Sequence, residues 1–294
     1  MPIKRSKQKQ SVMEPKLFTS PVLTLTIHDK VHDALVLMQT NFVKRVVIVK
    51  EKRPVGIITE RDLGRFLERD GTKRALDEIP LKEIMKKNLI TIQQNQADHF
   101  EQCATRMITF RIGSIIILDD EGNLAGITTQ TDVAAAFASL HEGKYKVKDY
   151  MTEKIVTCRD SDLLRYALEA INRNDVSRLI VTDNHGRLKG VITTNTFLRH
   201  SSYFKESHGT RNYLLPIESD ERTVDNLLEK EVLTVEPDTD LASAASLMIK
   251  NRVSGIPVVE QDRIVGVVTK FDVVRAYSNV VPHGKILERY KTFP

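Results

Sequence analysis

The sequence has no tryptophan, and aromatic residues make up only 6% of its 294 residues. A surface that stacks nucleic-acid bases depends on aromatic side chains and is therefore not expected. The two cysteines, Cys103 and Cys158, are far apart and match no CxxC or zinc-ligand spacing. We expect both to be small buried side chains in a reducing compartment, and we expect no metal site.

Long hydrophobic runs are also missing from the sequence. No apolar run approaches the roughly 20 residues that span a membrane, and residues 1–10 lack the apolar stretch of a signal peptide. These absences predict a cytoplasmic protein without a membrane partner. The remaining composition, 41% hydrophobic and 28% charged, is that of a globular chain, and the length predicts about two domains. The net charge of +5 permits an anionic ligand without requiring one.

An internal repeat runs through the whole chain. In each copy a glycine opens a short run that ends in threonine, and in three copies an aspartate follows three residues after that threonine. The copies are 56–62, 126–132, 190–196 and 266–272. Four such matches in register do not arise by chance, so the sequence predicts four copies of one structural unit.

Each unit is predicted to be a β-α-β-β-α repeat of about 60 residues. Short β-branched runs that end in threonine predict the first strands, at 22–24, 89–91, 155–157 and 232–234. A helix follows, and its expected cap is Asp29 in repeat one and Asp238 or Asp240 in repeat four. Continuous apolar runs predict central strands that pair with the glycine strands as hairpins, at 46–49, 115–118, 179–181 and 256–259. Since one unit leaves a sheet face uncovered, the units are expected to pack in pairs in an α+β fold.

The four-repeat pattern resembles the CBS-domain family from about Val12 to Ala276. Repeat four, with 253–259 followed by 266–272, is close to the family consensus, and 81–85 and 147–152 are similar to the family's lead-in helix. The chain is therefore similar to proteins with two tandem CBS pairs (Bateman modules), such as stand-alone prokaryotic CBS regulators and the gamma subunit of AMP-activated kinase. The resemblance implies that each pair stacks its sheets and helices around a pseudo-twofold axis. It also implies a flat disc, closed by one chain or by a homodimer.

The same resemblance implies a non-enzymatic regulator with no obligate cofactor. Its ligand would be AMP, ADP, ATP or S-adenosylmethionine, bound in a cleft between paired repeats. Its partner would be an unidentified protein that responds to the change in shape.

The aspartates of the repeat fit such a ligand. A carboxylate accepts hydrogen bonds from both hydroxyls of a ribose, as acidic residues do in dinucleotide sites. Asp62, Asp132 and Asp272 follow a strand at the start of a helix, where backbone amides favour a phosphate. The repeat threonines are expected to offer hydroxyls to the same ligand; they are Thr59, Thr129, Thr193 and Thr269.

These residues could instead serve only as helix caps, because threonine and aspartate are common at helix N-termini. The two roles are compatible. Repeat three departs from the pattern, since Thr196 replaces the aspartate and a hydroxyl cannot bridge two ribose hydroxyls. Its cleft is expected to be weak, empty or differently specific.

The resemblance implies further contacts. The candidates for ligand phosphates are Arg45, Arg61, Arg178 and Lys270, and the alternative for each is a solvated surface charge. The candidates for the base or ribose are Thr24, Thr91, Thr157, Thr234, Ile256 and Pro257. Threonine is also a common strand former, which is the simpler explanation for the first four.

No catalytic pattern is present. His28 and His32 lack the His-Glu-x-x-His context, and no Walker A, dinucleotide-glycine or nucleophile-elbow motif occurs. A fused catalytic barrel would need about 250 further residues.

The expected organisation is a basic disordered tail at 1–11, repeats at 12–69, 80–140, 146–200 and 223–279, linkers at 69–79 and 201–222, and a C-terminal tail at 280–294.

Two other functions stay open. A nucleic-acid partner, the less favoured one, would use the basic tail with Lys4, Arg5, Lys7 and Lys9, and its binding would fall steeply with salt. A structural subunit would have clefts that no longer bind a ligand.

Overall fold

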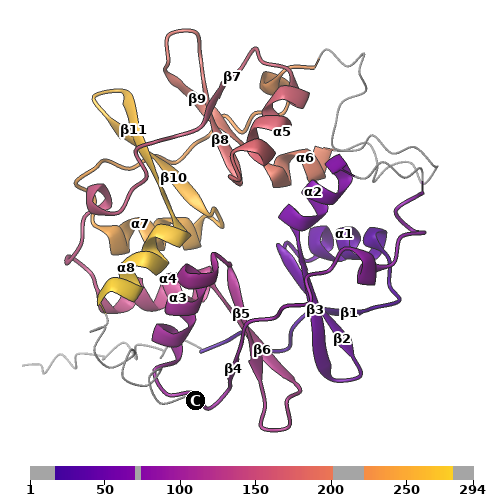
Figure 1. Ribbon diagram of the computed structural model, residues 1–294. Helices are drawn as coiled ribbons and strands as arrows, with labels where there is room; N and C mark the ends of the chain where they lie inside the picture. Colours follow the sequence, from indigo (N-terminus) through magenta and orange to yellow (C-terminus); the bar gives the residue numbers. More distant parts are fainter. Residues whose placement is uncertain (1–16, 70–73, 201–221, 281–294) are drawn as a thin grey trace, which may run out of the picture.

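A computed structural model of the chain describes residues 17–69, 74–200 and 222–280. In these residues the four repeats form a ring around a common centre (Figure 1). Repeat one lies between repeats two and three, and repeat four closes the ring on the opposite side. The expected tails and nearly all of the linker at 201–222 lie outside the described residues.

Each repeat contains a β-hairpin with one helix before it and one after it. The elements of repeat one are β1 (Thr24–Thr26), α1 (Val31–Thr40), β2 (Arg45–Lys50), β3 (Arg53–Thr59) and α2 (Glu60–Arg69). Those of repeat two are β4 (Thr91–Gln93), α3 (His99–Phe110), β5 (Ser114–Leu118), β6 (Leu124–Thr129) and α4 (Gln130–Leu140). Those of repeat three are β7 (Thr157–Arg159), α5 (Leu164–Arg173), β8 (Arg178–Thr182), β9 (Leu188–Thr193) and α6 (Thr194–His200). Those of repeat four are α7 (Leu241–Lys250), β10 (Gly255–Glu260), β11 (Arg263–Thr269) and α8 (Lys270–Val280).

The α+β fold and the hairpins are confirmed, but the first strands differ from the prediction. β1, β4 and β7 begin at the threonine where the predicted strands end, and each pairs in parallel with the central strand of its repeat. In repeat four the first strand shrinks to a single parallel bridge between Val235 and Val258. Only the strand boundary differs, since the residue before each threonine still contacts its own sheet: the carbonyl oxygens of Leu23, Ile90 and Val156 accept from N–H groups of the central strands.

The segment that leads into each repeat hydrogen-bonds to the glycine strand of the other repeat in its pair. The bridged residues are Thr19 with Ile127, Lys86 with Ile57, Thr152 with Val267, and Glu229 with Val191. Short 3₁₀ turns lie in the three later lead-ins, at Leu81–Glu83, Val147–Asp149 and Val224–Asn226. This exchange ties repeat one to repeat two and repeat three to repeat four, which confirms the two predicted pairs.

The repeat glycine makes this crossing possible. A Cβ on Gly126 would meet the ring of Phe18 and, at 2.9 Å, the carbonyl oxygen of Thr19. A Cβ on Gly266 would meet Met151 Sδ at 2.9 Å and the carbonyl oxygen of Thr152 at 3.0 Å. Only glycine therefore leaves room for the chain that crosses the strand.

Two local predictions need correction. Asp29 does not cap α1: its side chain accepts from the N–H of Thr26, and α1 begins after Lys30. The stretch at 74–79 is not a plain linker, because Leu76 and Ile79 are buried in the core beneath α1. The cap predicted in repeat four is confirmed, since Asp240 accepts from the N–H of Ser243 at 2.9 Å.

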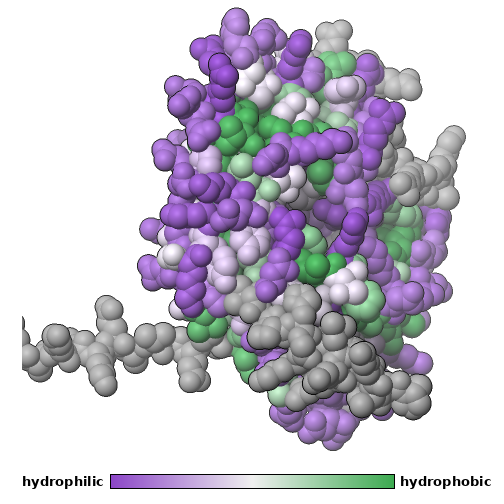
Figure 2. Space-filling view, turned by 60° about the vertical axis from the view of Figure 1, so that its left-hand side comes forward, coloured by the Kyte–Doolittle hydropathy of each residue, from purple (hydrophilic) through white to green (hydrophobic). Residues whose placement is uncertain are grey.

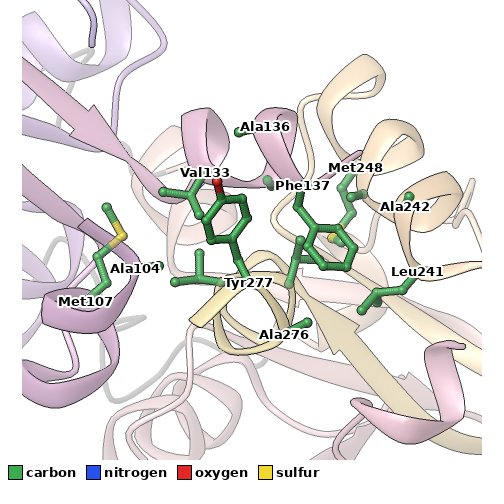
Figure 3. Close-up of a cluster of buried hydrophobic side chains, with 14 of the residues drawn as sticks. Ala104, Met107, Val133, Ala136, Phe137, Leu241, Ala242, Met248, Ala276 and Tyr277 are labelled. Carbon is green, nitrogen blue, oxygen red and sulfur yellow. The ribbon is translucent and has the colours of Figure 1, made fainter. Parts of the chain in front are cut away.

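The cores show how the ring is held together. The sheets of repeats one and two pack through Val47, Ile116 and Ile127. The helices, in contrast, pack mostly across pairs: one core joins repeats two and four (Figure 3), and another joins repeats one and three. The expected stacking of helices within each pair is therefore corrected to packing between the pairs. On the face in Figure 2, hydrophilic side chains predominate and apolar ones show only in separate patches.

Among the described helices, none combines the length and apolar character that crossing a membrane requires.

Candidate functional site

The repeat threonine and aspartate meet where the closing strand turns into the last helix of each repeat. The hydroxyls of Thr59, Thr129 and Thr269 donate to Oδ2 of the aspartate three residues later, at 2.6, 2.7 and 2.7 Å. The N–H of each threonine donates to the same oxygen. The helix-cap role is thus present in three repeats, and it uses only one of the two carboxylate oxygens.

The three aspartates differ in the contacts of their other carboxylate oxygen, Oδ1. Asp62 Oδ1 lies 2.7 Å from Lys86 Nζ, and Asp272 Oδ1 lies 2.9 Å from Arg275 NH2. In the described part of the chain, no hydrogen bond or ion pair occupies Oδ1 of Asp132. Asp132 therefore has an acceptor available to a ligand, whereas Asp62 and Asp272 must first release a cation. Burial raises the pKa of Asp272, which is 3% exposed.

Repeat three keeps the cap without the carboxylate. Thr193 Oγ1 and Thr196 Oγ1 are 3.0 Å apart, and each accepts from the other's backbone N–H. The junction is therefore neutral, and it lacks the paired acceptor oxygens that two vicinal hydroxyls would need.

The two odd repeats place an arginine opposite the motif threonine in the hairpin. Arg45 is paired with Thr59, and Arg178 with Thr193, while the even repeats have Ser114 and Gly255 at this position. Each arginine reaches over the small residues of the even repeat in its pair. The Arg45 guanidinium lies 3.1 Å from where a Cβ on Gly113 would be, and Arg178 NH2 donates to Ser254 Oγ at 2.5 Å. Burial lowers the pKa of both guanidinium groups, that of Arg178 to about 10.

These junctions converge at the ring centre. The hairpins radiate outward with their turns at the rim (Figure 1), so the motif ends face inward. Lys44 Nζ donates to Ser254 Oγ at 3.3 Å, a contact that joins repeat one to repeat four across the ring. Lys44, Arg178 and Ser254 thus bring repeats one, three and four together at one point.

Two further contacts at the centre cross the helix-packed interfaces. Lys270 Nζ donates to Thr131 Oγ1 at 3.0 Å, between repeats four and two. Asn195 Nδ2 donates to Glu60 Oε1 at 2.5 Å, between repeats three and one.

The centre is crowded with positive charge. Lys270 is only 7% exposed, and burial, reinforced by Lys44 and Arg178, lowers its pKa to about 8. The pKa of Lys44 is lowered by the surrounding protein and by Arg178, although Glu60 opposes the shift and the residue itself is exposed. Such a cluster is destabilised by mutual repulsion, which an anionic ligand would relieve.

The remaining predicted residues lie elsewhere. Arg61 pairs with Asp175 at 3.2 Å at the edge of the centre. Of the first-strand residues, Thr157 and Thr234 are exposed, and Thr24 and Thr91 are partly buried. Ile256 is fully buried in the core of repeats two and four, and Pro257 accepts from the N–H of Val235. None of these residues contacts a motif residue through a hydrogen bond within the described ranges.

A separate groove of about 540 Å³ opens at the outer rim between repeats one and two. It is lined by the hairpin turns and by Thr24, and it contains no residue of the Thr–Asp motifs. The groove therefore lies at the far end of the sheets from the charged centre.

Sequence reasoning missed Glu60, Thr131, Asn195 and Ser254. Their only signal in the sequence is position, since the first three lie between the motif threonine and the residue that caps it. Their contacts all join different repeats and so depend on how the ring closes.

Metal and thiol chemistry find no support in the described residues. No group of three His, Cys, Asp or Glu side chains is placed there to hold a metal ion. Cys103 and Cys158 are buried, as expected, and burial raises the pKa of each thiol to about 12, which leaves them unreactive.

Comparison with known proteins agrees with this architecture. The CBS domain model matches residues 14–69, 81–139, 147–203 and 224–279, which together make up most of the chain. The chain belongs to the CBS domain family.

Two relatives match this chain over most of their own length. Protein MJ1225 of Methanocaldococcus jannaschii is 28% identical over 273 residues, which cover 87% of this chain and 95% of that protein. Its crystal structure, described as that of a candidate archaeal homologue of γ-AMPK, aligns with a TM-score of 0.77 at 25% identity, over 89% of this chain and 98% of that one. A 33.4 kDa protein of a ribosomal RNA operon in Thermofilum pendens is 25% identical over 86% of this chain and 87% of its own length.

Enzymes match over a smaller part. Inosine-5'-monophosphate dehydrogenase of M. jannaschii is 31% identical over 133 residues, which are 45% of this chain but only 26% of the enzyme. The resemblance to enzymes is confined to the CBS part.

Proposed function

We propose that this chain is a non-enzymatic sensor of adenosine-type ligands that binds them where the motif helices meet the ring centre. The observation that carries the proposal is the placement of three Thr–Asp motifs around a centre lined by Lys44, Arg178 and Lys270. Carboxylates and cations gathered at one place suit a ligand that has vicinal hydroxyls at one end and phosphates at the other.

The ribose would bind at the carboxylates. Asp132 is the first candidate because its Oδ1 has no partner among the described residues. Asp62 and Asp272 would exchange Lys86 and Arg275 for the ribose hydroxyls, so binding there would shift those cations. Repeat three, with Thr196, would not bind a ribose in this way.

The phosphates would bind at the centre. Helix N-termini offer backbone amides there, and Lys44 and Arg178 both donate to Ser254 Oγ. Arg45 would contribute from repeat one, whereas Arg61 is held by Asp175. Because one ligand would contact several repeats, its binding would favour the ring geometry in which all these contacts form. A separate protein that recognises this geometry would receive the signal.

The relatives agree with this function. MJ1225 matches this chain over nearly all of its length and is described as a candidate γ-AMPK homologue, which supports an adenosine-type ligand. The dehydrogenase match covers only a quarter of that enzyme, so no catalytic activity is proposed. We propose that the protein acts in the cytoplasm.

Thermal unfolding with AMP, ADP, ATP and S-adenosylmethionine tests the proposal. A ligand at about 100 times its dissociation constant stabilises a protein by about 2.7 kcal/mol, a readily measured rise in Tm. A chain whose Tm responds to none of the four ligands is a structural subunit, and the proposal is then wrong. Tight binding of RNA or DNA that disappears at moderate salt would instead support the nucleic-acid function.

A matched pair of variants locates the site. Asp132→Asn keeps a cap acceptor but removes the charge, and we expect it to weaken nucleotide binding by about tenfold, since a charged hydrogen bond contributes roughly 1.5–3 kcal/mol. Asp240→Asn makes the same change at a cap outside the centre, on α7, and should leave binding unchanged. Equal effects of the two variants would place the site elsewhere.

A further inference from the structure

The residue that follows the motif threonine differs in charge around the ring. The four equivalent residues are Glu60, Gln130, Thr194 and Lys270. One is an acid and one is a base, and they belong to the two different helix-packed interfaces. Glu60 lies between repeats one and three, and Lys270 lies between repeats two and four.

Both charged residues make the same kind of contact. Each one hydrogen-bonds to the side chain two residues after the motif threonine of the facing repeat: Glu60 to Asn195 at 2.5 Å, and Lys270 to Thr131 at 3.0 Å. In neither case is the bonded partner charged. The two sites are therefore equivalent in position and opposite in charge.

Three cations act on Glu60. Lys44, Arg45 and Arg199 all interact with its carboxylate and oppose the effect of burial, which raises its pKa. Beside Lys270, the cations Lys44, Arg178 and Arg45 add to the effect of burial on its pKa, and Asp132 alone opposes them. Positive charge is therefore already partly neutralised on the side of repeats one and three, and remains in excess beside Lys270.

We propose that Glu60 is an internal counter-ion that selects ligands by charge. It directs a phosphate chain toward Lys270, Arg178 and Ser254, and it repels any anion that approaches repeats one and three. A ligand must then carry enough negative charge to gain more from the cations than it loses to Glu60. The ligand class is an oligophosphate, favoured over a monophosphate and over S-adenosylmethionine, whose sulfonium group is cationic. For a nucleotide this inference rests on the proposed function, whereas its phosphate part can be tested alone.

Calorimetric titration with inorganic tripolyphosphate, ATP and adenosine tests the inference in the full chain. Glu60→Gln keeps the oxygen that accepts from Asn195, and we expect it to bind tripolyphosphate and ATP about three- to tenfold more tightly than the wild type. Lys270→Gln should bind both about three- to tenfold more weakly. Adenosine binding should change less than about twofold in either variant, because adenosine carries no charge.

Glu121→Gln is the matched control. It makes the same change in net charge at the outer rim, where salt screens its effect on the centre beyond about 8 Å at 0.15 M. The inference is overturned if Glu60→Gln binds tripolyphosphate no more tightly than Glu121→Gln does, or if no form of the protein binds tripolyphosphate. Wild-type protein that binds tripolyphosphate but neither ATP nor adenosine would reject the proposed nucleotide function, and the tripolyphosphate affinities of the variants would still decide the role of Glu60.

Discussion

The ring is closed by two helix interfaces of different chemistry. Between repeats two and four, α4 packs on both α7 and α8, and α3 packs on α8. Small residues such as Ala136, Ala242 and Ala276 let these helices approach closely, and Phe137 and Tyr277 fill the space between them (Figure 3). This interface is a continuous apolar core.

Between repeats one and three, polar contacts surround the apolar core. Arg65 pairs with Asp175 on the facing repeat, and the equivalent Arg199 lies over the ring of Phe42 at 5.7 Å. Asp175 and Phe42 occupy the same turn of their repeats, with φ of 53° and 54°. Gln39 Nε2 also donates to the carbonyl oxygen of Leu198 at 2.9 Å.

The difference shows how one repeated unit can serve two purposes. Separating an apolar interface costs much free energy because it exposes apolar surface to water. Exposed ion pairs cost little to separate, because water and salt replace the lost contacts. We therefore expect the interface of repeats two and four to hold the ring together, and that of repeats one and three to adjust when the centre binds a ligand.

The largest expected effect is at the apolar interface. Phe137→Ala should lower the free energy of unfolding by about 3–5 kcal/mol, because Phe137 is fully buried between the two repeats. Phe42→Ala, which removes an exposed ring under Arg199, should cost about 1 kcal/mol or less. Urea denaturation compares the two. A larger cost for Phe42→Ala would reverse the comparison between the interfaces.

Substitution of a repeat glycine should have the next largest effect on stability. In Gly126→Ala the new Cβ would meet the backbone of Thr19, which cannot move without displacing the lead-in segment, and we expect a loss of about 1–3 kcal/mol. In Gly56→Ala it would meet the flexible side chain of Met85, and the loss should be smaller. Thermal unfolding of the two variants checks the order, and equal losses would contradict it.

The lowered pKa of Lys270 predicts that the stability of the folded protein depends on pH. Burial lowers its pKa to about 8, from an ordinary value of 10.5, so between these values the unfolded chain binds a proton that the folded chain does not. Stability contributed by Lys270 should therefore rise with pH from about 8 to 10.5, by at most about 1.4 kcal/mol per pH unit. Lys270→Met should abolish this rise in urea titrations, and Lys250→Met, at an exposed position, should keep it. A wild-type profile in Lys270→Met would reject the argument.

The smallest effect concerns the polar contacts of repeats one and three. Arg65→Ala should cost no more than about 1 kcal/mol, and less in high salt, because the partner Asp175 is exposed. Denaturation at two salt concentrations measures the loss. A cost of several kcal/mol that salt does not change would show that this interface holds the ring as firmly as the other.

Much of the fold could be read from the sequence because it depends on local patterns. The hairpins at 46–59 and 256–269 follow from apolar runs and turn residues, and the Thr59–Asp62 cap follows from neighbouring residues in the chain. The predicted cap at Asp29 was wrong because Asp33, one turn further on, binds the backbone of Lys30 instead. The burial of Leu76 and Ile79 is not predictable from the sequence, because two apolar residues in a short polar stretch carry no periodicity.

The candidate site was only half predictable for a related reason. Asp132 and Lys270 belong to the repeated motif and were found from it. Glu60, Asn195 and Ser254 become significant only through contacts between repeats, such as that of Lys44 with Ser254, more than 200 positions along the chain. No local pattern encodes such a contact.

By itself the sequence determined that this chain lacks tryptophan, long apolar runs and catalytic motifs, and that it repeats one unit four times, because these properties depend on composition and local order. Tertiary structure alone decided which repeats face each other, because the lead-in segments cross between the sheets and the helices pack across the pairs. It also decided that Lys44 and Arg178, from repeats one and three, meet at Ser254 of repeat four. Charge acts through space, and its effect at the centre is set by how the ring closes.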